Sequence, residues 1–379
     1  MNCIRSLITL ILLFWIGLSM ASDISLRDKI GQMLLIGFEG KMIDAKSSIT
    51  KAIEEDNIGG VILFDYNSRN KTFDMNIETP EQVNKLNHQL KQVTHEANIA
   101  HHRADLPLLI SVDYEGGKVN RLKEKYGFPI TVSAKEIGKM SMEEAEMHAS
   151  AMGNTLRFTG FNLDFAPVTD VDVNPENPII GKHERSFSVN PEEVTTFASI
   201  FSQQFLQWGV QCAYKHFPGH GSSTADSHLG FVDVTDSWHE QELIPYLQLL
   251  SQPKHCGVVM TAHIINRKLD ASGVPATLSQ TILTGILRHE LKFDGVIITD
   301  DMQMKAIADN YSPEDAITMA INAGADMLIF GNQLPDSPQD PKDIINIIQK
   351  KVEIGEIAVN RINEAYRHIT ALKKSLKSH

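Results

Sequence analysis

The stretch that decides the fold is Val210-Gln211-Cys212-Ala213-Tyr214 followed by Lys215-His216-Phe217-Pro218-Gly219-His220-Gly221-Ser222-Ser223-Thr224-Ala225-Asp226-Ser227-His228. Its first five residues form a short apolar run that is typical of a buried strand. Pro218, Gly219 and Gly221 then disfavour a helix or a continued ladder, so we expect a loop from residue 215 onward. Loops that are held by a rigid scaffold are where chemistry is usually found. The Lys, Asp and three His residues of this loop therefore mark it as a candidate site.

Two other stretches repeat this pattern of a buried strand followed by charge. Residues 295–301, GVIITDD, end in two adjacent carboxylates, and residues 108–117, LLISVDYEGG, carry an Asp and a Glu. In all three stretches the charged groups come just past the C-terminal end of the expected strand. An α/β barrel builds its active site on that face.

Strands and helices are expected to alternate along the whole chain. The apolar runs are continuous rather than alternating, which indicates strands buried on both faces, as in a parallel sheet. A doubly wound open sheet is the alternative, but it would carry a Gly-rich phosphate-binding turn after the first strand, and Phe38-Glu39-Gly40 is no such turn. We therefore predict the α/β class, with a single (β/α)8 TIM-like barrel. The expected strands cover residues 32–38, 58–64, 106–112, 163–168, 210–214, 257–261, 295–299 and 326–330, and two helices follow the last.

The composition limits the partners. The chain has 379 residues, 42% of them hydrophobic, and a formal net charge of −12. An acidic chain argues against nucleic acid and against anionic membrane surfaces as partners. It says nothing against a neutral substrate.

The N-terminus has the features of a secretory signal peptide. Arg5 precedes an apolar run over residues 7–18, and Ser19-Met20-Ala21 fits the small-x-small cleavage pattern. We expect residues 1–21 to be removed, leaving residues 22–379 as one barrel domain with C-terminal helices. The alternative, an uncleaved anchor, is disfavoured because the run is shorter than the ~20 residues that span a bilayer. The mature protein is expected to be exported, periplasmic or extracellular, without a stable membrane anchor.

Two cysteines, Cys212 and Cys256, remain after this cleavage, and both lie in apolar runs that we interpret as successive strands. A disulfide is allowed in an oxidising compartment. Buried free thiols are nevertheless the expectation, because unpaired Cys behaves as a small buried hydrophobe.

The histidines of the loop allow two interpretations. Imidazole and carboxylate groups suit zinc or iron, so a metal-dependent barrel hydrolase is one hypothesis. Against it, Pro and Gly separate the histidines on a loop, whereas metal sites need ligands at fixed positions. The other interpretation pairs Asp226 with His228, since a carboxylate beside an imidazole raises its basicity and fixes its tautomer. This pair would act as a general acid and base.

Asp300 and Asp301 are adjacent at a strand end, so their side chains should point in opposite directions. Only one of them is then expected to face a substrate, and Asp301 or a following residue is expected to cap a helix. A buried carboxylate that faces a cationic cluster would be ionised and able to attack.

The sequence resembles glycoside hydrolase family 3 β-N-acetylglucosaminidases. The matching pieces appear in the family's order over about residues 28–335. They are SVDYEGGKVNR at 111–121, FAPVTDV at 165–171, GKHERSF at 181–187, the stretch 215–228 and GVIITDDMQM at 295–304. The piece Asp226-Ser227-His228 resembles the N-acetylglucosaminidase branch, whereas the β-glucosidase and β-xylosidase branches lack it.

This resemblance implies roles for individual residues. Asp300 corresponds to the nucleophile, and His228 with Asp226 to the acid/base pair. Five other residues correspond to family residues that hold the sugar in the subsite to the left of the cleaved bond: Asp113, Arg121, Arg185, Lys215 and His216. For each basic residue, an ion pair with a neighbouring carboxylate is the alternative. The implied activity is a retaining exo-β-N-acetylglucosaminidase that acts on peptidoglycan-derived or chitin-derived GlcNAc units, with no metal or organic cofactor.

Two other functions stay open. A phosphorylase is possible because a neutral His repels phosphate less than a carboxylate would, and an inactive barrel that only binds sugar is the alternative outside the enzymes. We expect a small carbohydrate as the partner and a monomer. The loop is rich in Gly and small residues, so we also expect it to be mobile and to bring His228 in when a sugar is bound.

Overall fold

The computed structural model describes residues 24–333 and 338–376, and its centre is a closed barrel of eight strands in the order β1-β12-β11-β9-β7-β6-β3-β2. Every neighbouring pair in the barrel is parallel. The predicted (β/α)8 barrel is therefore confirmed. The strands are β1 Leu34–Gly37, β2 Gly60–Ile62, β3 Leu109–Val112, β6 Leu163–Asp164, β7 Gln211–Phe217, β9 Val258–Thr261, β11 Val296–Asp301 and β12 Met327–Phe330.

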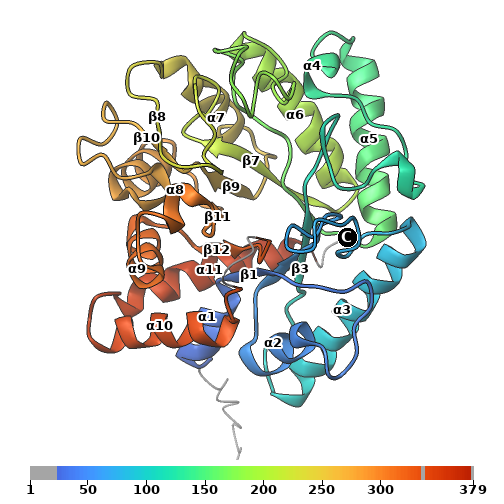
Figure 1. The fold of residues 1–379 in the computed structure, drawn as a ribbon, viewed down its shortest axis with the longest axis vertical. Coiled ribbons are helices and arrows are strands. Elements are labelled where there is room, and N and C mark those ends of the chain that lie inside the picture. Colours follow the sequence, from blue (N-terminus) through green and yellow to red (C-terminus); the bar gives the residue numbers. More distant parts are fainter. Residues whose placement is uncertain (1–23, 334–337, 377–379) are drawn as a thin grey trace, which may run out of the picture.

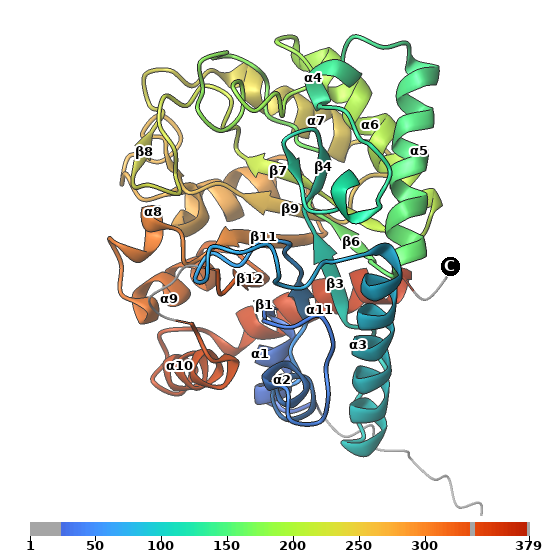
Figure 2. The same cartoon turned by 45° about the vertical axis from the view of Figure 1, so that its right-hand side comes forward.

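Helices surround the barrel (Figure 1). Between successive strands lie α2 Ser48–Asp56, α3 Pro80–Ala100, α5 Met142–Thr159, α6 Pro191–Gln207, α7 Ile244–Leu250, the π-helix Thr281–Glu290 and α9 Pro313–Ala323. The described part of the chain begins with α1 Leu26–Gln32 and ends with α10 Pro341–Glu353 and α11 Val359–Leu376, and the short helices α4 Ala134–Ile137 and α8 Lys305–Ala308 lie in loops. Figures 1 and 2 both show α5 and α6 side by side on one flank.

The helix starts follow the capping signals of the sequence. Ser141 and Glu144 form a capping box at the start of α5, and the side chains of Thr79, Asn190 and Ser312 accept hydrogen bonds from the first turns of α3, α6 and α9. These caps satisfy backbone N–H groups that a helix leaves free at its N-terminus.

Several element boundaries differ from the prediction. Strand β7 extends through Phe217, so Lys215 and His216 lie on the strand and not on the loop. The expected strand over residues 163–168 is regular only over two residues, with an isolated bridge from Val168 to Lys215 further on. The helical segment between β7 and β9 consists of a 3-10 turn, Glu240–Leu243, followed by α7. Two small ladders lie outside the barrel, Tyr114–Gly116 (β4) against Val119–Asn120 (β5) and Val232–Asp233 (β8) against Ile264–Ile265 (β10).

Cys212 and Cys256 form a disulfide, so the expectation of free thiols was wrong. Cys212 lies on β7, and Cys256 lies just before β9, which is the barrel neighbour of β7. This pairing holds the two Cα atoms 4.8 Å apart, within the range that a disulfide needs. A sequence shows that two strands follow each other along the chain. It does not show which of their residues lie opposite each other in the sheet.

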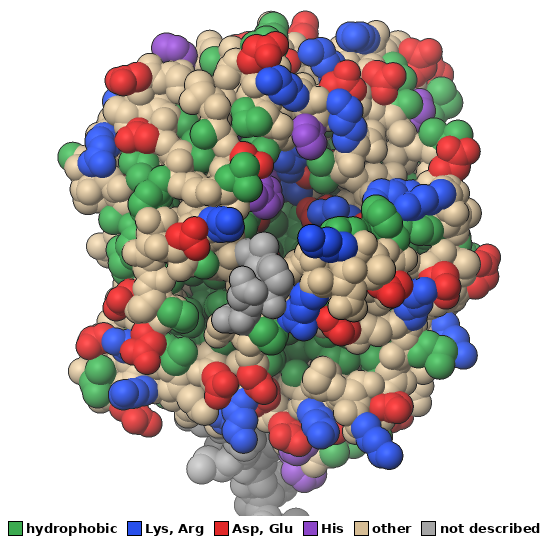
Figure 3. Space-filling model, in the orientation of Figure 1, with side chains coloured by type: hydrophobic (Ala, Val, Ile, Leu, Met, Phe, Trp, Pro, Cys, Tyr) green, Lys and Arg blue, Asp and Glu red, His purple; other side chains and the backbone are tan. Residues whose placement is uncertain are grey.

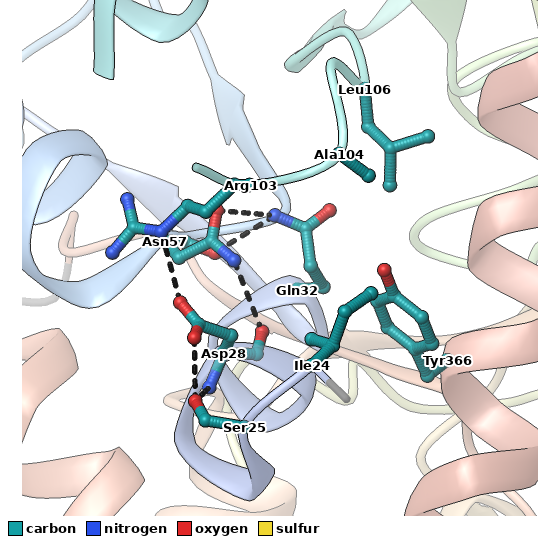
Figure 4. Close-up of a pocket in the computed structure, with 9 residues that line it drawn as sticks. All are labelled: Ile24, Ser25, Asp28, Gln32, Asn57, Arg103, Ala104, Leu106 and Tyr366. Atoms are coloured by element: carbon teal, nitrogen blue, oxygen red, sulfur yellow. Dashed lines mark hydrogen bonds and ion pairs between the residues drawn. The ribbon is translucent and has the colours of Figure 1, made fainter. Parts of the chain in front are cut away.

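A small cavity of about 160 Å³ lies where α1, the end of α2 and the segment before β3 meet (Figure 4). Its polar groups bond mainly to one another: Arg103 to Asp28, Asp28 to Ser25, and Gln32 to Asn57. On the other side of Gln32, the buried ammonium of Lys373 donates to its Oε1 at 2.7 Å. The predicted signal peptide, residues 1–21, lies outside the described residues. Within the described parts of the chain, no helix is both long and apolar enough to cross a bilayer.

Candidate active site

A cavity of about 420 Å³ opens at the C-terminal ends of the barrel strands. Figure 3 shows a hollow near the middle of this face, with His, Lys and Arg side chains at its margin. All eight residues that the sequence singled out border this cavity: Asp113, Arg121, Arg185, Lys215, His216, Asp226, His228 and Asp300. The structure therefore brings together groups from four separate stretches of the chain, residues 111–121, 181–187, 215–228 and 295–304.

One wall of the cavity is an ionic cluster, which we call the Lys215 cluster and which consists of Asp113, Glu115, Arg121, Arg185 and Lys215. The buried Lys215 Nζ lies 2.9 Å from Asp113 Oδ1 and 2.6 Å from Glu115 Oε1. Arg185 donates to both oxygens of Glu115 at 2.7 Å, and Arg121 lies 3.6 Å from Asp113. The ion pairs that were the alternative for the basic residues are thus present. They fix the direction of each side chain and leave further donor and acceptor positions for a ligand.

The charges in this cluster sustain one another. Burial alone would raise the pKa of Glu115, but Arg185 and Lys215 hold it at about 2. Burial opposes ionisation of Asp113 as well, and Lys215 with Arg121 still lowers its pKa. The pKa of Lys215 is raised, because the two carboxylates outweigh the effect of burial. The cluster is therefore fully ionised at neutral pH.

His216 is held in one orientation by Asp170, a buried residue on the segment after β6. Its Nδ1 lies 2.7 Å from Asp170 Oδ2, and its Nε2 lies 3.3 Å from the Nη2 of Arg185. Because a guanidinium only donates, Nε2 accepts from Arg185, and the proton between His216 and Asp170 lies on Nδ1. Asp170 Oδ1 also accepts from the backbone N–H groups of His216 and His220.

Asp300 lies at the end of β11 and borders the cavity. Burial would raise the pKa of its carboxyl, but His263, His216 and His228 lower it, so the group is ionised. No ion pair with Lys or Arg is found for Asp300 in the described part of the chain. The hydrogen bond from the N–H of Asp301 to Oδ1, at 2.8 Å, fixes the side chain.

Asp301 also borders the cavity, but its carboxylate is engaged elsewhere. Oδ1 accepts from the backbone N–H of Gln303 at 3.0 Å, and Oδ2 lies so close to Gly331 that a Cβ there would be 2.5 Å from it. Burial raises the pKa of Asp301 to about 6. The expected helix-capping role is not observed, because α8 begins after Met304 without a side-chain cap.

His228 and Asp226 lie in a loop over residues 218–231, which we call the His228 loop. The ring Nδ1 of His228 and Oδ1 of Asp226 are 2.8 Å apart, and the backbone N–H of His228 donates to the same oxygen. The His228 side chain is 59% exposed. The predicted carboxylate–imidazole pair is thus formed, and Nε2, which has no hydrogen-bond partner among the described residues, is available to a ligand.

The first half of this loop is more firmly held than we expected. Residues 218–223 are all buried, whereas only Ser227 is buried among residues 224–231. Asp170, Asn174, Asn177 and Glu242 bond to the backbone of the first half. The expectation that small residues leave the whole loop without anchors was therefore wrong for residues 218–223.

The sequence reasoning missed several residues that shape the site. Glu115 appeared only as the neighbour of Asp113, yet it holds both Arg185 and Lys215. His263, which comes after β9 as a polar residue at a strand end, donates from Nε2 to the carbonyl of Asp301 at 3.0 Å. Its position just past a strand end was the signal that would have found it.

The three histidines of residues 215–228 do not converge on one point. His216 bonds to Asp170, His220 to two serines, and His228 to Asp226. Within residues 24–333 and 338–376, no group of three or more His, Cys, Asp or Glu side chains is arranged to hold a metal ion. The donor set for the metal-dependent hypothesis is therefore not assembled in this arrangement.

Comparison with known proteins gives a family. The model of the glycosyl hydrolase family 3 N terminal domain matches residues 25–372. Beta-hexosaminidase A of Pseudoalteromonas piscicida is 33% identical over 334 residues, which are 83% of this chain and 52% of that protein. Beta-hexosaminidase LpqI of Mycobacterium tuberculosis is 29% identical over 358 residues, 92% of this chain and 83% of that protein. The chain thus spans about half the length of the Pseudoalteromonas relative.

Solved structures agree with this match. A glycoside hydrolase family 3 beta-N-acetylglucosaminidase from Paenibacillus sp. str. FPU-7 superposes with a TM-score of 0.81 and 33% identity, covering 93% of this chain and 63% of that one. The beta-N-acetylhexosaminidase from Beutenbergia cavernae DSM 12333 gives 0.81 and 25% identity, covering 93% and 99%. With a family model that matches most of its length and these related structures, the chain belongs to glycosyl hydrolase family 3.

Proposed function

We propose that this protein is a retaining exo-β-N-acetylglucosaminidase that hydrolyses terminal β-linked GlcNAc. The observation that carries the proposal is the ionised Asp300 carboxylate, which borders one cavity together with the Asp226–His228 pair and the Lys215 cluster. The names of the relatives, beta-hexosaminidase and beta-N-acetylglucosaminidase, support this substrate class.

The two steps use Asp300 and His228 in turn. In the first step an Asp300 oxygen forms a bond to the anomeric carbon, the bond to the leaving oxygen breaks, and protonated His228 gives that oxygen a proton. Asp226 Oδ1, 2.8 Å from Nδ1, holds the ring in one orientation and leaves Nε2 for the leaving oxygen. In the second step neutral His228 takes a proton from water, and the water oxygen displaces Asp300 from the sugar.

The Lys215 cluster would hold the terminal sugar. A sugar ring presents hydroxyl groups, which both donate and accept, and no charge. Asp113 can accept from them, while Arg121, Arg185 and Lys215 donate. Hydrogen bonds to charged partners are stronger than neutral ones, which suits a small uncharged ligand.

A trapping experiment tests the nucleophile. A fluorinated GlcNAc inactivator should form a covalent adduct on the peptide that contains Asp300, and Asp300→Ala should lose activity. Labelling of another residue, or full activity of this variant, would contradict the assignment.

A second experiment tests the proton donor. General acid assistance contributes about 10²–10⁴ in rate and matters most for poor leaving groups. His228→Ala should therefore lose far more activity on natural disaccharides than on nitrophenyl glycosides, and Asp226→Asn should show the same pattern more weakly. Equal losses on both substrates would move the donor to Glu115, Asp170 or Glu184.

Product analysis addresses the competing phosphorylase. The Asp226–His228 pair favours this alternative to the extent that neutral His repels phosphate less than a carboxylate would. Free GlcNAc as the product with and without phosphate supports hydrolysis, whereas GlcNAc 1-phosphate would identify a phosphorylase. The same assay on muropeptides beside chitin oligomers identifies the natural substrate class.

We also propose that the protein is exported after cleavage behind Ala21. The Cys212–Cys256 disulfide supports this, because disulfides persist in oxidising compartments. N-terminal sequencing of exported protein should begin at Ser22. An intact Met1 in the membrane fraction would favour an anchor.

A further inference from the structure

The His228 loop divides into two halves that differ in how they are held. The first half, residues 218–223, is buried, and a Cβ on Gly221 would lie 1.7 Å from the carbonyl oxygen of Val171. The outer half, residues 224–231, carries Asp226 and His228 and is mostly exposed. A contact between the two halves can therefore hold His228 in place relative to the fixed first half.

Carboxylates and amides fix the first half through its backbone. Asp170 accepts from the N–H of His220 at 2.7 Å, and Glu242 accepts from the N–H of Gly221 at 3.0 Å. Asn177 donates to the carbonyl of His220 at 2.8 Å. The His220 side chain thus projects from a segment whose backbone has little freedom to move.

The ring of His220 reaches from this fixed half to the outer half. Its Nδ1 lies 2.5 Å from Ser223 Oγ, and its Nε2 lies 3.3 Å from Ser227 Oγ. Ser227 is 2% exposed and stands between Asp226 and His228 in the chain. Its carbonyl also accepts from the N–H of Ala306 at 3.3 Å, beside the strand end that carries Asp300.

We propose that His220 is a positioning residue, which places the Asp226–His228 pair over the cavity by holding the hydroxyl of Ser227. This proposal rests on the proposed function, because it assigns His220 a role in presenting the proton donor. His220 is not placed to act as a second acid beside His228, because both of its ring nitrogens already bond to serine hydroxyls.

We call the hydrogen bond between His220 Nε2 and Ser227 Oγ the latch, and the chemistry of the His220 ring suits it. Burial, with His216 adding to it, lowers the pKa of His220 to about 4, so the ring is neutral at physiological pH. A neutral imidazole has one donor and one acceptor nitrogen, and a serine hydroxyl can serve either role. Each ring nitrogen therefore finds a partner, one in each half of the loop. A single bond of 3.3 Å to the outer half is weak enough to break when the loop has to open for substrate or product.

Ser227→Ala removes the latch with the least change in shape. A misplacement of about 1 Å in a reacting group costs about 10²-fold in rate. We expect kcat on a GlcNAc disaccharide to fall about 10- to 100-fold, with KM and kcat on a nitrophenyl glycoside nearly unchanged. Ser227→Thr keeps the hydroxyl and should recover most of the loss. Ser202→Ala, which removes an equally buried serine on α6, is the matched control.

Hydrogen exchange provides a readout that needs no turnover. In Ser227→Ala, peptides over residues 224–231 should exchange about 10-fold faster, while residues 216–222 and the Ser202→Ala control stay as in the wild type. Unchanged exchange over 224–231 would overturn the latch, even if the wild type proves to hydrolyse no GlcNAc glycoside and the proposed function fails. Faster exchange combined with equal rate losses on both substrates would show that the bond orders the loop without positioning His228.

Discussion

Glu242 is a buried carboxylate that holds the His228 loop from the side opposite the cavity. It lies in the 3-10 turn Glu240–Leu243 and is fully shielded from solvent. Oε2 accepts from the backbone N–H groups of Gly221 and Ser222, at 3.0 and 3.3 Å. Burial raises the pKa of Glu242 to about 7, although these bonds act in the opposite direction. We predict that Glu242→Gln removes a pH-dependent penalty on folding.

The direction and size of this pH effect follow from the difference between the folded-state and unfolded-state pKa values of Glu242. The folded-state pKa of about 7 lies above the unfolded value of 4.5, so below pH 4.5 both states bind the proton and this group adds no penalty. As pH rises from 4.5 to 7, the unfolded state gives up the proton while the folded state still holds it, so unfolding becomes steadily more favourable. At 1.36 kcal/mol for each pKa unit, the penalty reaches about 3 kcal/mol above pH 7. Gln at this position has no proton to lose and therefore carries no such penalty.

Urea unfolding of wild type and variant, at several pH values between 4.5 and 7.5, measures this difference. The free energy of unfolding of Glu242→Gln relative to wild type should rise by about 3 kcal/mol across that range. Glu242→Ala should show the same dependence on pH at lower overall stability, because Gly221 and Ser222 then lose their acceptor. A difference between wild type and Glu242→Gln that is flat with pH would refute the reasoning.

Three other outcomes are expected. Burial lowers the pKa of Lys373 from 10.5 to about 7, so the charged form destabilises the fold fully below pH 7, and this penalty disappears as pH rises to 10.5. In unfolding titrations, the free energy of unfolding of Lys373→Met should exceed that of the wild type below pH 7, and this difference should shrink by up to about 5 kcal/mol as pH rises to 10.5. A difference that does not change between pH 7 and 9.5 would contradict this. Removal of the 44-residue cross-link in Cys212→Ala/Cys256→Ala should cost about 4 kcal/mol in urea unfolding, whereas unchanged stability would rule out that contribution. Asp113→Asn should raise KM for aryl GlcNAc glycosides at least about 10-fold, since a charged acceptor is lost, and an unchanged KM would remove Asp113 from the sugar site.

The barrel could be predicted because its signal is local. Each strand is a short apolar run, such as LISV in β3 or MLIF in β12, and Asp113, Lys215, His216 and Asp300 lie at the C-terminal ends of such runs. In a parallel barrel the C-terminal ends of all strands share one face, so strand ends alone bring distant residues together. Asp113, Lys215, His216 and Asp300 border one cavity for this reason, and Arg121, Arg185, Asp226 and His228 reach it from the loops that follow the strands.

Which side chains pair with one another could not be predicted in the same way. The pairing of Arg185 with Glu115 joins residues 70 positions apart, and the Cys212–Cys256 bond depends on the register between β7 and β9. The anchors of residues 218–223 come from other loops, so the Gly-rich composition of that segment gave the wrong expectation. The composition of a segment indicates how mobile that segment would be in isolation. It does not indicate which contacts with other segments hold it in place.

The carboxylates of the cavity show why neighbours, more than residue type, assign a role. Asp113 and Glu115 owe their low pKa values to Lys and Arg groups, and those ion pairs occupy their oxygens. Asp300 is kept ionised by imidazoles instead, from His263, His216 and His228. Without a Lys or Arg ion pair in the described part of the chain, its charge is stabilised while a lone pair stays available for attack. The electrostatic surroundings therefore favour sugar binding for Asp113 and nucleophilic attack for Asp300, although both are aspartates at strand ends of one barrel.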